Sequence, residues 1–348
     1  MKQLIGLDIG YGFVKVTNGT VGYSFPSVIG DGFIDSLYRI NSNNMPLVYD
    51  LKVGINNKVY FVGRSAIKHS KFVYRDLATS RSSINDFNIL FFSALSLFCE
   101  DAINEFNVVT GLPVERMHLL EQLKKEVMGQ TSFIIYRNNM PKEIKININA
   151  LEIVPQPLGT FWSQMLNSRG QVVKSLEGRT GIIDIGFGTT DIVALDDGEF
   201  IPSRSRTIAT GISTTYNEIR SNIMAMHGIE KETYALDEAV IKRHIKKDGN
   251  IVDISNIVND AFEKLAINIA VEINSTWSVP EYDNLYLTGG GGQAISAHIT
   301  KHIPRAKCIP DALSANSMGY LLWANRLWSI GSEVGIKDAY GNSVESAL

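Results

Sequence analysis

Short apolar runs and longer mixed patterns alternate along the chain and predict strands and helices. The first forty residues are rich in β-branched and aromatic residues interrupted by Gly or Pro, which predicts several strands. Apolar spacing predicts a buried helix from 89 to about 106, a strand from 106 to 113 and an amphipathic helix over 114–130. With a further strand pair up to residue 157, this order predicts an α/β fold for the first half.

The second half begins with the same kind of pattern. From residue 178, a strand, a Gly-x-Gly turn and a second strand lead to Asp-Asp-Gly, a hairpin signal. Helical patterns follow at 211–228, 235–249 and 252–277. A strand, four glycines and a helix come next, and a last helix is predicted within 313–331.

One long-period repeat links the two halves. Placing "LDIGYGFVKV" over "IDIGFGTTDI" aligns Asp8 with Asp184 and both Gly-x-Gly turns, while Lys15 aligns with Asp191. The copies start about half a chain apart, and each begins an α/β half. A duplicated two-lobed architecture with a cleft between the lobes is therefore predicted.

Composition excludes several functional classes. A chain of 348 residues exceeds what one core usually organises, so two domains are expected. A net charge of -3 gives no electrostatic reason for direct binding to nucleic acid or an anionic membrane. The N-terminus lacks a secretory signal and the apolar segment 89–99 is too short to span a membrane, so a cytoplasmic protein is expected. Cys99 and Cys308 are expected to be reduced core residues.

The two Gly-x-Gly turns are candidate phosphate sites. Bare backbone N–H groups in such turns hold phosphate oxygens, so two facing copies would grip a polyphosphate from both sides. Asp8 and Asp184 would then lie near the phosphates and hold a hydrated Mg²⁺ through its waters. Lys15 and two threonine hydroxyls would add contacts, with a solvent-facing strand residue as the alternative for Lys15. The candidates in the turns are Gly10, Tyr11, Gly12, Lys15, Gly186, Phe187, Gly188, Thr189 and Thr190.

The glycines Gly289, Gly290, Gly291 and Gly292 form a third candidate site. They lie between a strand and a helix, where backbone can approach a base and ribose closely. A flexible loop, or a dinucleotide-binding turn with Asp311 as the ribose acid, is the alternative, but too few residues remain for a dinucleotide domain. No P-loop motif occurs in the sequence. A lone Asp-x-Gly-x-Gly is often only a hairpin turn, so the repeat carries the phosphate hypothesis.

These motifs resemble those of the actin, Hsp70 and sugar-kinase superfamily. "LDIGYGFVKV", "IDIGFGTTDIVAL" and "LTGGGG" are similar, in order and spacing, to its two phosphate motifs and its adenosine motif. "YGFVKV", "FPSVIG", "VVTGLPVE" and "DIGFGTTD" look most like ParM/StbA-type bacterial and plasmid actins and their archaeal relatives. The resemblance covers about residues 4 to 322 and implies two actin-like domains with ribonuclease-H-like cores closing over Mg-ATP, with GTP left open.

The resemblance also implies roles for single residues. A Gln in the first interdomain connection positions the attacking water in this family, which implies a catalytic role for Gln156 together with Asp184. A polar loop residue between two prolines is the alternative for Gln156. Gly211 matches a glycine near the nucleotide, and Lys242 or Arg243 is the candidate for a basic residue near the base, with a solvated helix face as the alternative. Gly319 matches a close helix contact at the second connection.

The resemblance implies the domain limits as well. Residues 1–156 form the first domain, with a small subdomain at about 31–75, and a C-terminal helix at 315–340 completes it. Residues 157–314 form the second domain, with a small subdomain at about 212–278.

A filament-forming ATPase is the function that the sequence favours. A chaperone would need a further domain, and a membrane-tethered relative would need an amphipathic tail, whereas Trp323 and Trp328 are expected to pack a closing helix on the core. The expected partners are further copies of the chain and a DNA-binding adaptor, as in plasmid segregation, with no direct nucleic-acid or membrane contact. A small-molecule kinase is the alternative, although no acid among Asp76, Asp86 and Asp101 has the context of a catalytic base.

Overall fold

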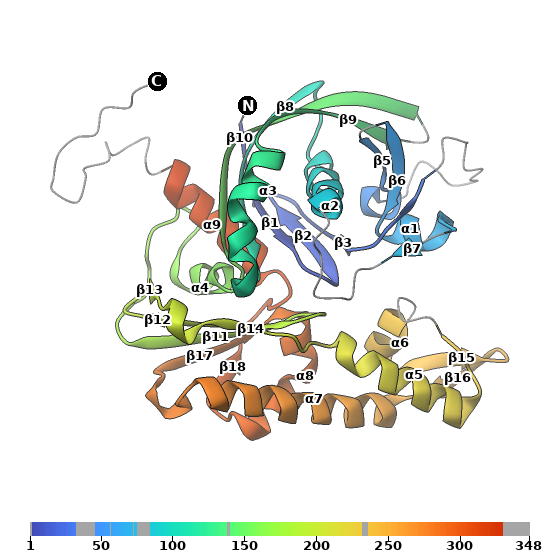
Figure 1. Cartoon of the computed structure of the whole chain (residues 1–348), viewed down its shortest axis with the longest axis vertical. Coiled ribbons are helices and arrows are strands. Elements are labelled where there is room, and N and C mark those ends of the chain that lie inside the picture. Colours follow the sequence, from blue (N-terminus) through green and yellow to red (C-terminus); the bar gives the residue numbers. More distant parts are fainter. Residues whose placement is uncertain are drawn as a thin grey trace.

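A computed structural model describes residues 2–32, 46–55, 57–71, 73–74, 84–137, 140–231 and 236–329. Its elements form two lobes, which lie in the upper and lower parts of Figure 1. Asp76, most of the segment 31–46 and the predicted helical residues after 329 lie outside the described residues.

The first lobe is built on a large mixed sheet. Its strands are β1 (Gln3–Ile9), β2 (Phe13–Thr17), β3 (Gly22–Pro26), β4 (Ile29–Asp31), β5 (Lys52–Ile55), β6 (Lys58–Val62), β7 (Val73–Tyr74), β8 (Ile103–Leu112), β9 (Gly129–Arg137) and β10 (Met140–Pro155). Its helices are α1 (Arg64–His69), α2 (Ile84–Ser96), α3 (Leu120–Val127) and the 3₁₀ helices η1 (Leu47–Tyr49) and η2 (Val114–Leu119). In the described residues the strand order is β3-β2-β1-β8-β10-β9-β5-β6-β4-β7.

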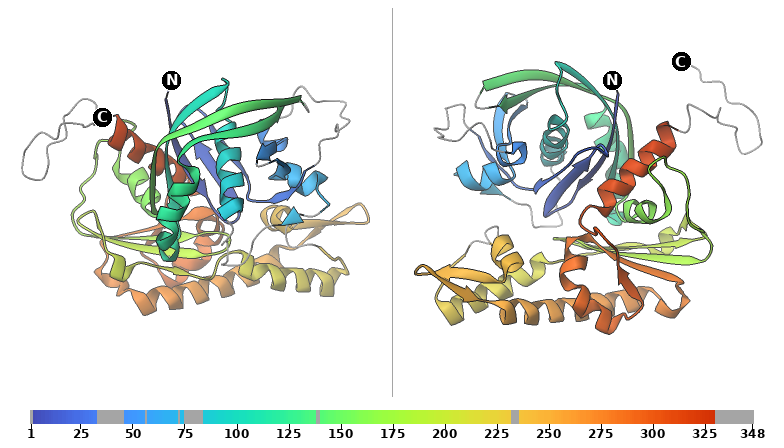
Figure 2. Two further views of the ribbon diagram at one scale, coloured as in Figure 1. Left: turned by 45° about the horizontal axis from the view of Figure 1, so that its top comes forward. Right: turned by 180° about the vertical axis from the view of Figure 1, so that it is seen from behind.

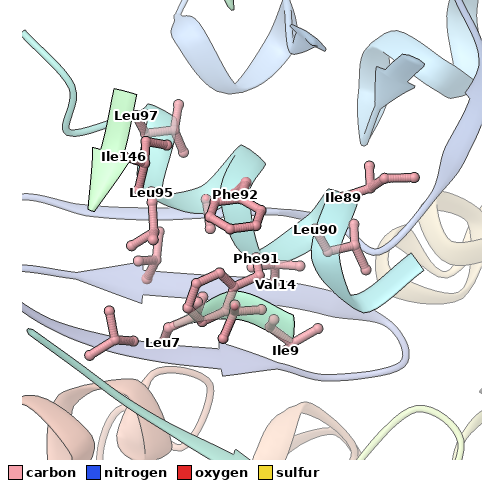
Figure 3. Packing of buried hydrophobic residues seen from close by; sticks show 14 of the residues in the cluster. Leu7, Ile9, Val14, Ile89, Leu90, Phe91, Phe92, Leu95, Leu97 and Ile146 are labelled. Carbon is pink, nitrogen blue, oxygen red and sulfur yellow. The ribbon is translucent and has the colours of Figure 1, made fainter. Parts of the chain in front are cut away.

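The core of the first lobe lies between this sheet and α2. Strands β1, β8 and β10 run parallel at the centre, and their near-continuous apolar sequence fits burial on both faces. Figure 3 shows Phe91 and Phe92 of α2 among Leu7, Ile9 and Val14 of β1 and β2. This packing fixes the strand ends that carry the first Gly-x-Gly turn.

The second lobe has a smaller sheet covered by long helices. Its strands are β11 (Arg179–Ile185), β12 (Thr190–Asp196), β13 (Glu199–Phe200), β14 (Arg206–Ile208), β17 (Asn284–Thr288) and β18 (Ala306–Cys308), with a separate hairpin of β15 (His244–Lys247) and β16 (Asn250–Asp253). Its helices are α5 (Ser213–His227), α6 (Leu236–Lys242), α7 (Ser255–Thr276), α8 (Gly289–His302) and the 3₁₀ helices η3 (Pro202–Arg204) and η5 (Val279–Glu281). Helix α7 contributes nine buried residues to the core, because its apolar positions recur at helical spacing.

Two further helices, α4 (Leu158–Met165) and α9 (Ala315–Trp328), cross each other. Helix α9 packs on strands β1 and β8 of the first lobe, and α4 contacts β11 of the second. They cross at Gly159 and Gly319, where a Cβ added to Gly319 would lie 1.6 Å from the Gly159 carbonyl oxygen. Trp162 and Trp323 stack with ring centroids 4.3 Å apart, and Trp328 packs on the same cluster. Figure 2 shows α9 alongside the first-lobe sheet from behind. The expectation that this closing helix packs on the core is confirmed.

Several predicted elements differ from the structure. Helix α2 ends at Ser96 instead of about residue 106, because the polar residues Glu100 and Asp101 come shortly before strand β8. Residues 244–253, predicted to be helical in part, form the β15–β16 hairpin, whose turn places Asp248 and Gly249 at positive φ. The helix predicted over 114–130 is η2 followed by α3. Cys308 is exposed rather than a core residue, because it lies on the last strand of the second-lobe sheet.

Within the described residues, no helix combines the length and apolar character that crossing a membrane requires.

Candidate functional site

The two Gly-x-Gly turns have the same local geometry. In the first, the Gly10 N–H donates to the Phe13 carbonyl at 3.2 Å, and in the second the Gly186 N–H donates to the Thr189 carbonyl at 2.8 Å. Both turns join antiparallel strands, β1 to β2 and β11 to β12. The repeat in the sequence therefore corresponds to a repeat in backbone structure.

The two turns also contact each other across the lobes. A Cβ on Gly12 would lie 2.7 Å from the Phe187 Cβ, and a Cβ on Gly188 would lie 3.0 Å from the Tyr11 Cγ. Each turn thus packs its aromatic residue against a glycine of the other. A side chain at either glycine would push the lobes apart.

A cavity of about 410 Å³ lies at this contact, within the usual range of small-molecule sites. It is lined from both lobes and by the start of α8. The predicted residues that line it are Asp8, Gly10, Tyr11, Gly12, Lys15, Gln156, Asp184, Gly186, Phe187, Thr189, Gly289, Gly290 and Gly291. The structure therefore brings most of the predicted residues to one cavity, although they are spread over the whole chain.

Five predicted residues do not line the cavity. Gly188 faces Tyr11, Gly211 packs on the backbone of the second turn, and Gly292 faces Leu287. The buried Thr190 hydroxyl donates to the Thr210 carbonyl at 2.7 Å, so it points away from a ligand. Lys242 does not line the cavity either, and its exposed ammonium pairs with Glu238 one helical turn earlier, so its contact with a nucleotide stays a prediction.

Arg243, the other basic candidate, lines the cavity, as Lys15 does. Its guanidinium lies over the Phe262 ring at 4.9 Å, and its N–H donates to the Asn259 side chain at 3.2 Å. Burial lowers the pKa of Arg243 from its ordinary value. The surrounding wall, from α5 to α7, presents rings and aliphatic side chains, which suits a flat, partly apolar group.

The negative charge of Asp8, at the end of β1, is compensated by residues of its own lobe. Only 2% of the residue is exposed. The Lys15 ammonium donates to one carboxylate oxygen at 3.0 Å, and the Gln156 amide donates to the other. Lys15 therefore pairs with the acid of its own hairpin, and a contact between Lys15 and a phosphate stays a prediction.

Asp184, at the equivalent place on β11, has no cation of its own hairpin. Burial raises the pKa of Asp184 to about 7, with Asp8 and Asp191 adding to the rise and the hydrogen bond from Asn316 opposing it. Asn316 donates to the carboxylate at 2.7 Å. At neutral pH this acid is poised between its two charge states, so a cation in the cavity would favour the ionised one.

Gly289 allows the third glycine segment to approach Asp184. Its φ is +81°, and an added Cβ would lie 2.3 Å from the Asp184 Oδ1. The segment is not a flexible loop, because the four glycines form the first turn of α8. Its bare backbone lies directly beside the second turn.

Asn316 and Asp191 are among the residues of the site that the sequence analysis missed. Asn316 lies at the start of α9, and its side-chain oxygen accepts from the Thr160 N–H at 3.0 Å and the Thr160 hydroxyl at 2.8 Å. Asp191 is aligned with Lys15 by the repeat, but it was given no role. That exchange of a cation for an acid at a matched position was the signal available in the sequence.

The carboxylates of the cavity suit a metal ion whose other ligands are water and phosphate oxygens. Within the described part of the chain, no group of three or more His, Cys, Asp or Glu side chains is arranged to hold a metal ion. Asp8 and Asp184 both line the cavity. Mg²⁺ is typically bound by one or two carboxylates, with waters and phosphate oxygens as its other ligands, so these two acids suit it.

This fold and site define the class of two-lobed actin-like proteins. Residues 6–159 match the family model of the N-terminal domain of actin-like proteins. Residues 182–301 match that of the C-terminal domain of the archaeal MreB-like actin homologue. The chain belongs to the actin-like proteins, and the predicted α/β fold of two actin-like domains is confirmed.

Solved structures extend this likeness over nearly the whole chain. A ParM of a 15-stranded filament from Clostridium botulinum superposes with a TM-score of 0.80 at 24% identity, covering 94% of this chain and 100% of that one. An archaeal actin homologue in complex with ADP gives 0.76 at 19% identity, covering 93% and 99%. Bacillus thuringiensis ParM with AMPPNP gives 0.70 at 17% identity, covering 94% and 99%. The search of curated protein sequences found no match.

Proposed function

We propose that this chain is an ATPase that binds Mg-ATP between its lobes and polymerises into dynamic filaments. One observation carries the proposal: two Gly-x-Gly turns, each following a buried acid, face one cavity and contact each other across the lobes. A ligand held by both turns would bind the two lobes together. Nucleotide occupancy would thereby set their relative position, which is what nucleotide-controlled assembly requires.

The cavity supports the binding of a nucleoside triphosphate. The backbone N–H groups of both turns and the Thr189 hydroxyl would hold phosphate oxygens. The first turn of α8 and the wall that carries Arg243 would hold the ribose and the base. Asp8 and Asp184 would hold Mg²⁺ through water, and the metal would supply charge neutralisation for the phosphates.

Gln156 is the proposed residue for positioning the attacking water. Its backbone is held on both sides, since its N–H donates to the Leu112 carbonyl at 2.8 Å and its carbonyl accepts from the Tyr320 hydroxyl at 2.8 Å. Its amide reaches the cavity and bonds to Asp8. An amide orients water without bringing a further charge toward the phosphates, and such positioning supplies much of the catalysis in phosphoryl transfer.

The likeness to the Clostridium botulinum filament protein supports self-assembly. We also propose that the filament moves plasmid or other DNA through an adaptor protein in the cytoplasm. The net charge of -3 supports an indirect contact with DNA. We further propose the domain limits 1–156 with 315–340, and 157–314.

A small-molecule kinase with the same site is the second candidate. Such an enzyme needs a base near the acceptor hydroxyl, but neither Asp86 nor Asp101 lines the cavity. Of the acids that line it, Asp8 and Asp184 are proposed to serve the phosphate end, and Asp191 already accepts three hydrogen bonds. Asp237 accepts a hydrogen bond from the Tyr216 hydroxyl at 2.7 Å. The lining acids therefore favour hydrolysis over transfer to a second substrate.

The test is phosphate release measured with sedimentation over a range of protein concentrations. With Mg-ATP, we expect polymer to pellet above a critical concentration, and phosphate release to rise steeply above the same concentration. Hydrolysis without polymer at any concentration would contradict the filament proposal and favour the kinase.

A further inference from the structure

Asp191 of β12 lies where the two lobes meet and accepts three hydrogen bonds from described residues. Only 3% of the residue is exposed, yet it lines the cavity. Three donors from described residues reach its carboxylate: the Val114 N–H at 3.2 Å, the Thr207 hydroxyl, and the Thr189 hydroxyl at 3.1 Å. A buried carboxylate is stable only with such donors, so each of them matters for its position.

One side of this carboxylate contacts the first lobe. Val114 begins the 3₁₀ helix η2, which follows the end of strand β8. The next residue makes a parallel contact, since the Glu115 N–H donates to the Thr207 hydroxyl oxygen at 3.3 Å. Two consecutive N–H groups of the first lobe are thus docked on Asp191 and Thr207 of the second.

The other side contacts the second Gly-x-Gly turn. Thr189 donates its hydroxyl to Asp191 Oδ2, while its carbonyl accepts the N–H of Gly186 that closes the turn. Thr189 itself lines the cavity. The Asp191 carboxylate therefore contacts both the second Gly-x-Gly turn, through Thr189, and the first lobe, through Val114.

The asymmetry of the repeat explains this placement. In the first hairpin, Lys15 lies opposite Asp8 in register and forms an ion pair with it. In the second hairpin, Asp191 lies opposite Asp184, and two carboxylates cannot pair in this way. Asp191 instead takes its donors from the opposite lobe, from strand β14 of its own lobe and from its own turn.

From this geometry we propose that Asp191 is a positioning residue that couples ligand contact at the second turn to docking of residues 114–115 across the cleft. A ligand oxygen that accepts the Thr189 hydroxyl removes one of the three donors of a buried carboxylate. The carboxylate then depends more on Val114 and Thr207, which draws η2 onto the second lobe. The inference rests on the proposed nucleotide site.

The test is the distance between spin labels on the two lobes. Cys308 is an exposed label site in the second lobe, and a Met140→Cys substitution adds one in the first, where Met140 is 71% exposed. Cys99 is replaced by Ser. Distances are measured by pulsed electron paramagnetic resonance without ligand, with Mg-ADP and with Mg-AMPPNP, at concentrations where light scattering detects no polymer.

We expect Mg-AMPPNP to shift the distance distribution in the otherwise unaltered protein. Asp191→Ala should lose most of that shift at ligand saturation, which calorimetry verifies, with the binding constant weakened at most about tenfold. Asp191→Asn keeps an oxygen that accepts from Val114, so it should keep most of the shift. Asp196→Ala, on the same strand but half-exposed and paired with Arg179, is the matched control and should behave like the unaltered protein.

Two outcomes would overturn the proposal. A full shift in Asp191→Ala would show that the lobes close without this contact, while the proposed nucleotide site would stand. No shift in the unaltered protein would also overturn the coupling, and calorimetry without detectable binding would contradict the nucleotide site as well. If Asp191→Ala fails to fold, Thr207→Val takes its place. This substitution removes a donor to Asp191 and the acceptor of the Glu115 N–H. A full shift in Thr207→Val would contradict the coupling.

Discussion

Asp8 and Asp184 face one cavity, but their charges are balanced by different means. Asp8 has Lys15 and the Gln156 amide, whereas Asp184 has the neutral amide of Asn316. Burial and the neighbouring acids hold the pKa of Asp184 at about 7. Ionised Asp184 is therefore under electrostatic strain from burial and the neighbouring acids, and a bound cation would relieve it.

This strain predicts a dependence of stability on pH. Because the pKa of Asp184 is raised from 3.8 to about 7, and that of Asp191 to about 6, the folded protein holds protons that the unfolded chain releases above pH 4. The free energy of unfolding should fall as pH rises from about 4 to 7. Asp184→Asn should flatten the profile and raise stability at pH 7.5 by about 1 to 3 kcal/mol.

Urea denaturation of the ligand-free protein at a series of pH values measures both effects. Asp196→Asn, far from the cavity on β12, is the control. Parallel profiles for Asp184→Asn and the unaltered protein would mean that Asp184 is not an acid with a raised pKa.

Gln156 gives a second prediction at the residue scale. Gln156→Ala should lower ATP hydrolysis about 10- to 100-fold, because the water loses its orienting group, while nucleotide affinity stays within a few-fold. Phosphate release and calorimetry measure the two quantities. Gln164→Ala, on α4 outside the cavity, is the control. A normal hydrolysis rate in Gln156→Ala would refute the assigned role.

Site residues whose role depends on residues next to them in the chain could be predicted from the sequence. Asp8 and Asp184 each precede a Gly-x-Gly turn, so acid and bare backbone are adjacent in the chain. Asn316 could not be predicted in this way, because it reaches Asp184 from 132 residues further along. Asp191 depends likewise on Val114, 77 residues earlier, and only tertiary structure brings them together.

At the scale of elements, the crossing of α4 and α9 is the tightest contact near the site. Gly319 on α9 faces the backbone of Gly159 on α4, and the same helix supplies Asn316 to Asp184. The start of α9 therefore holds a site residue only while the two helices remain this close. The family resemblance implied a close contact at Gly319, but did not identify its partner.

Gly319→Ala tests the crossing. In an isolated helix this change would stabilise by up to about 1 kcal/mol. Here the added methyl group would overlap the Gly159 carbonyl, so we expect a loss of about 1 to 3 kcal/mol or more, measured by urea denaturation. Met318→Ala, at a half-exposed neighbouring position, should change stability little. A variant of Gly319 at least as stable as the unaltered protein would contradict the crossing.

The order of elements could be predicted largely from hydrophobic pattern, and the exceptions have local causes. The segment 235–249 has helical composition, but Arg243, Asp248 and Gly249 adopt positive φ, which ends α6 and turns the β15–β16 hairpin. The spacing of apolar residues does not indicate where the chain reverses direction. The end of α2 was predicted too late, because the apolar sequence runs on to Cys99 past the last helical turn.

For the whole molecule, the cavity lies where the two lobes meet, so a ligand bound there would contact both lobes. Both turns, both acids and the α8 glycines surround it, and the aromatic residue of each turn fits against the glycine of the other. Nothing in the sequence of either half alone specifies this contact. The repeat indicated two lobes with a cleft, but the interlocking of Tyr11 with Gly188 and of Phe187 with Gly12 required the structure.

Nucleotide-dependent assembly of the chain can be observed by electron microscopy with parallel light scattering. With Mg-ATP we predict filaments and a rise in scattering, fewer or shorter filaments with Mg-ADP, and none for Asp184→Ala, which loses an acid proposed to hold the metal. Asp196→Ala should form filaments like the unaltered protein. A protein that binds Mg-ATP but remains monomeric at high concentration, or an Asp184→Ala variant that polymerises normally, would contradict the account.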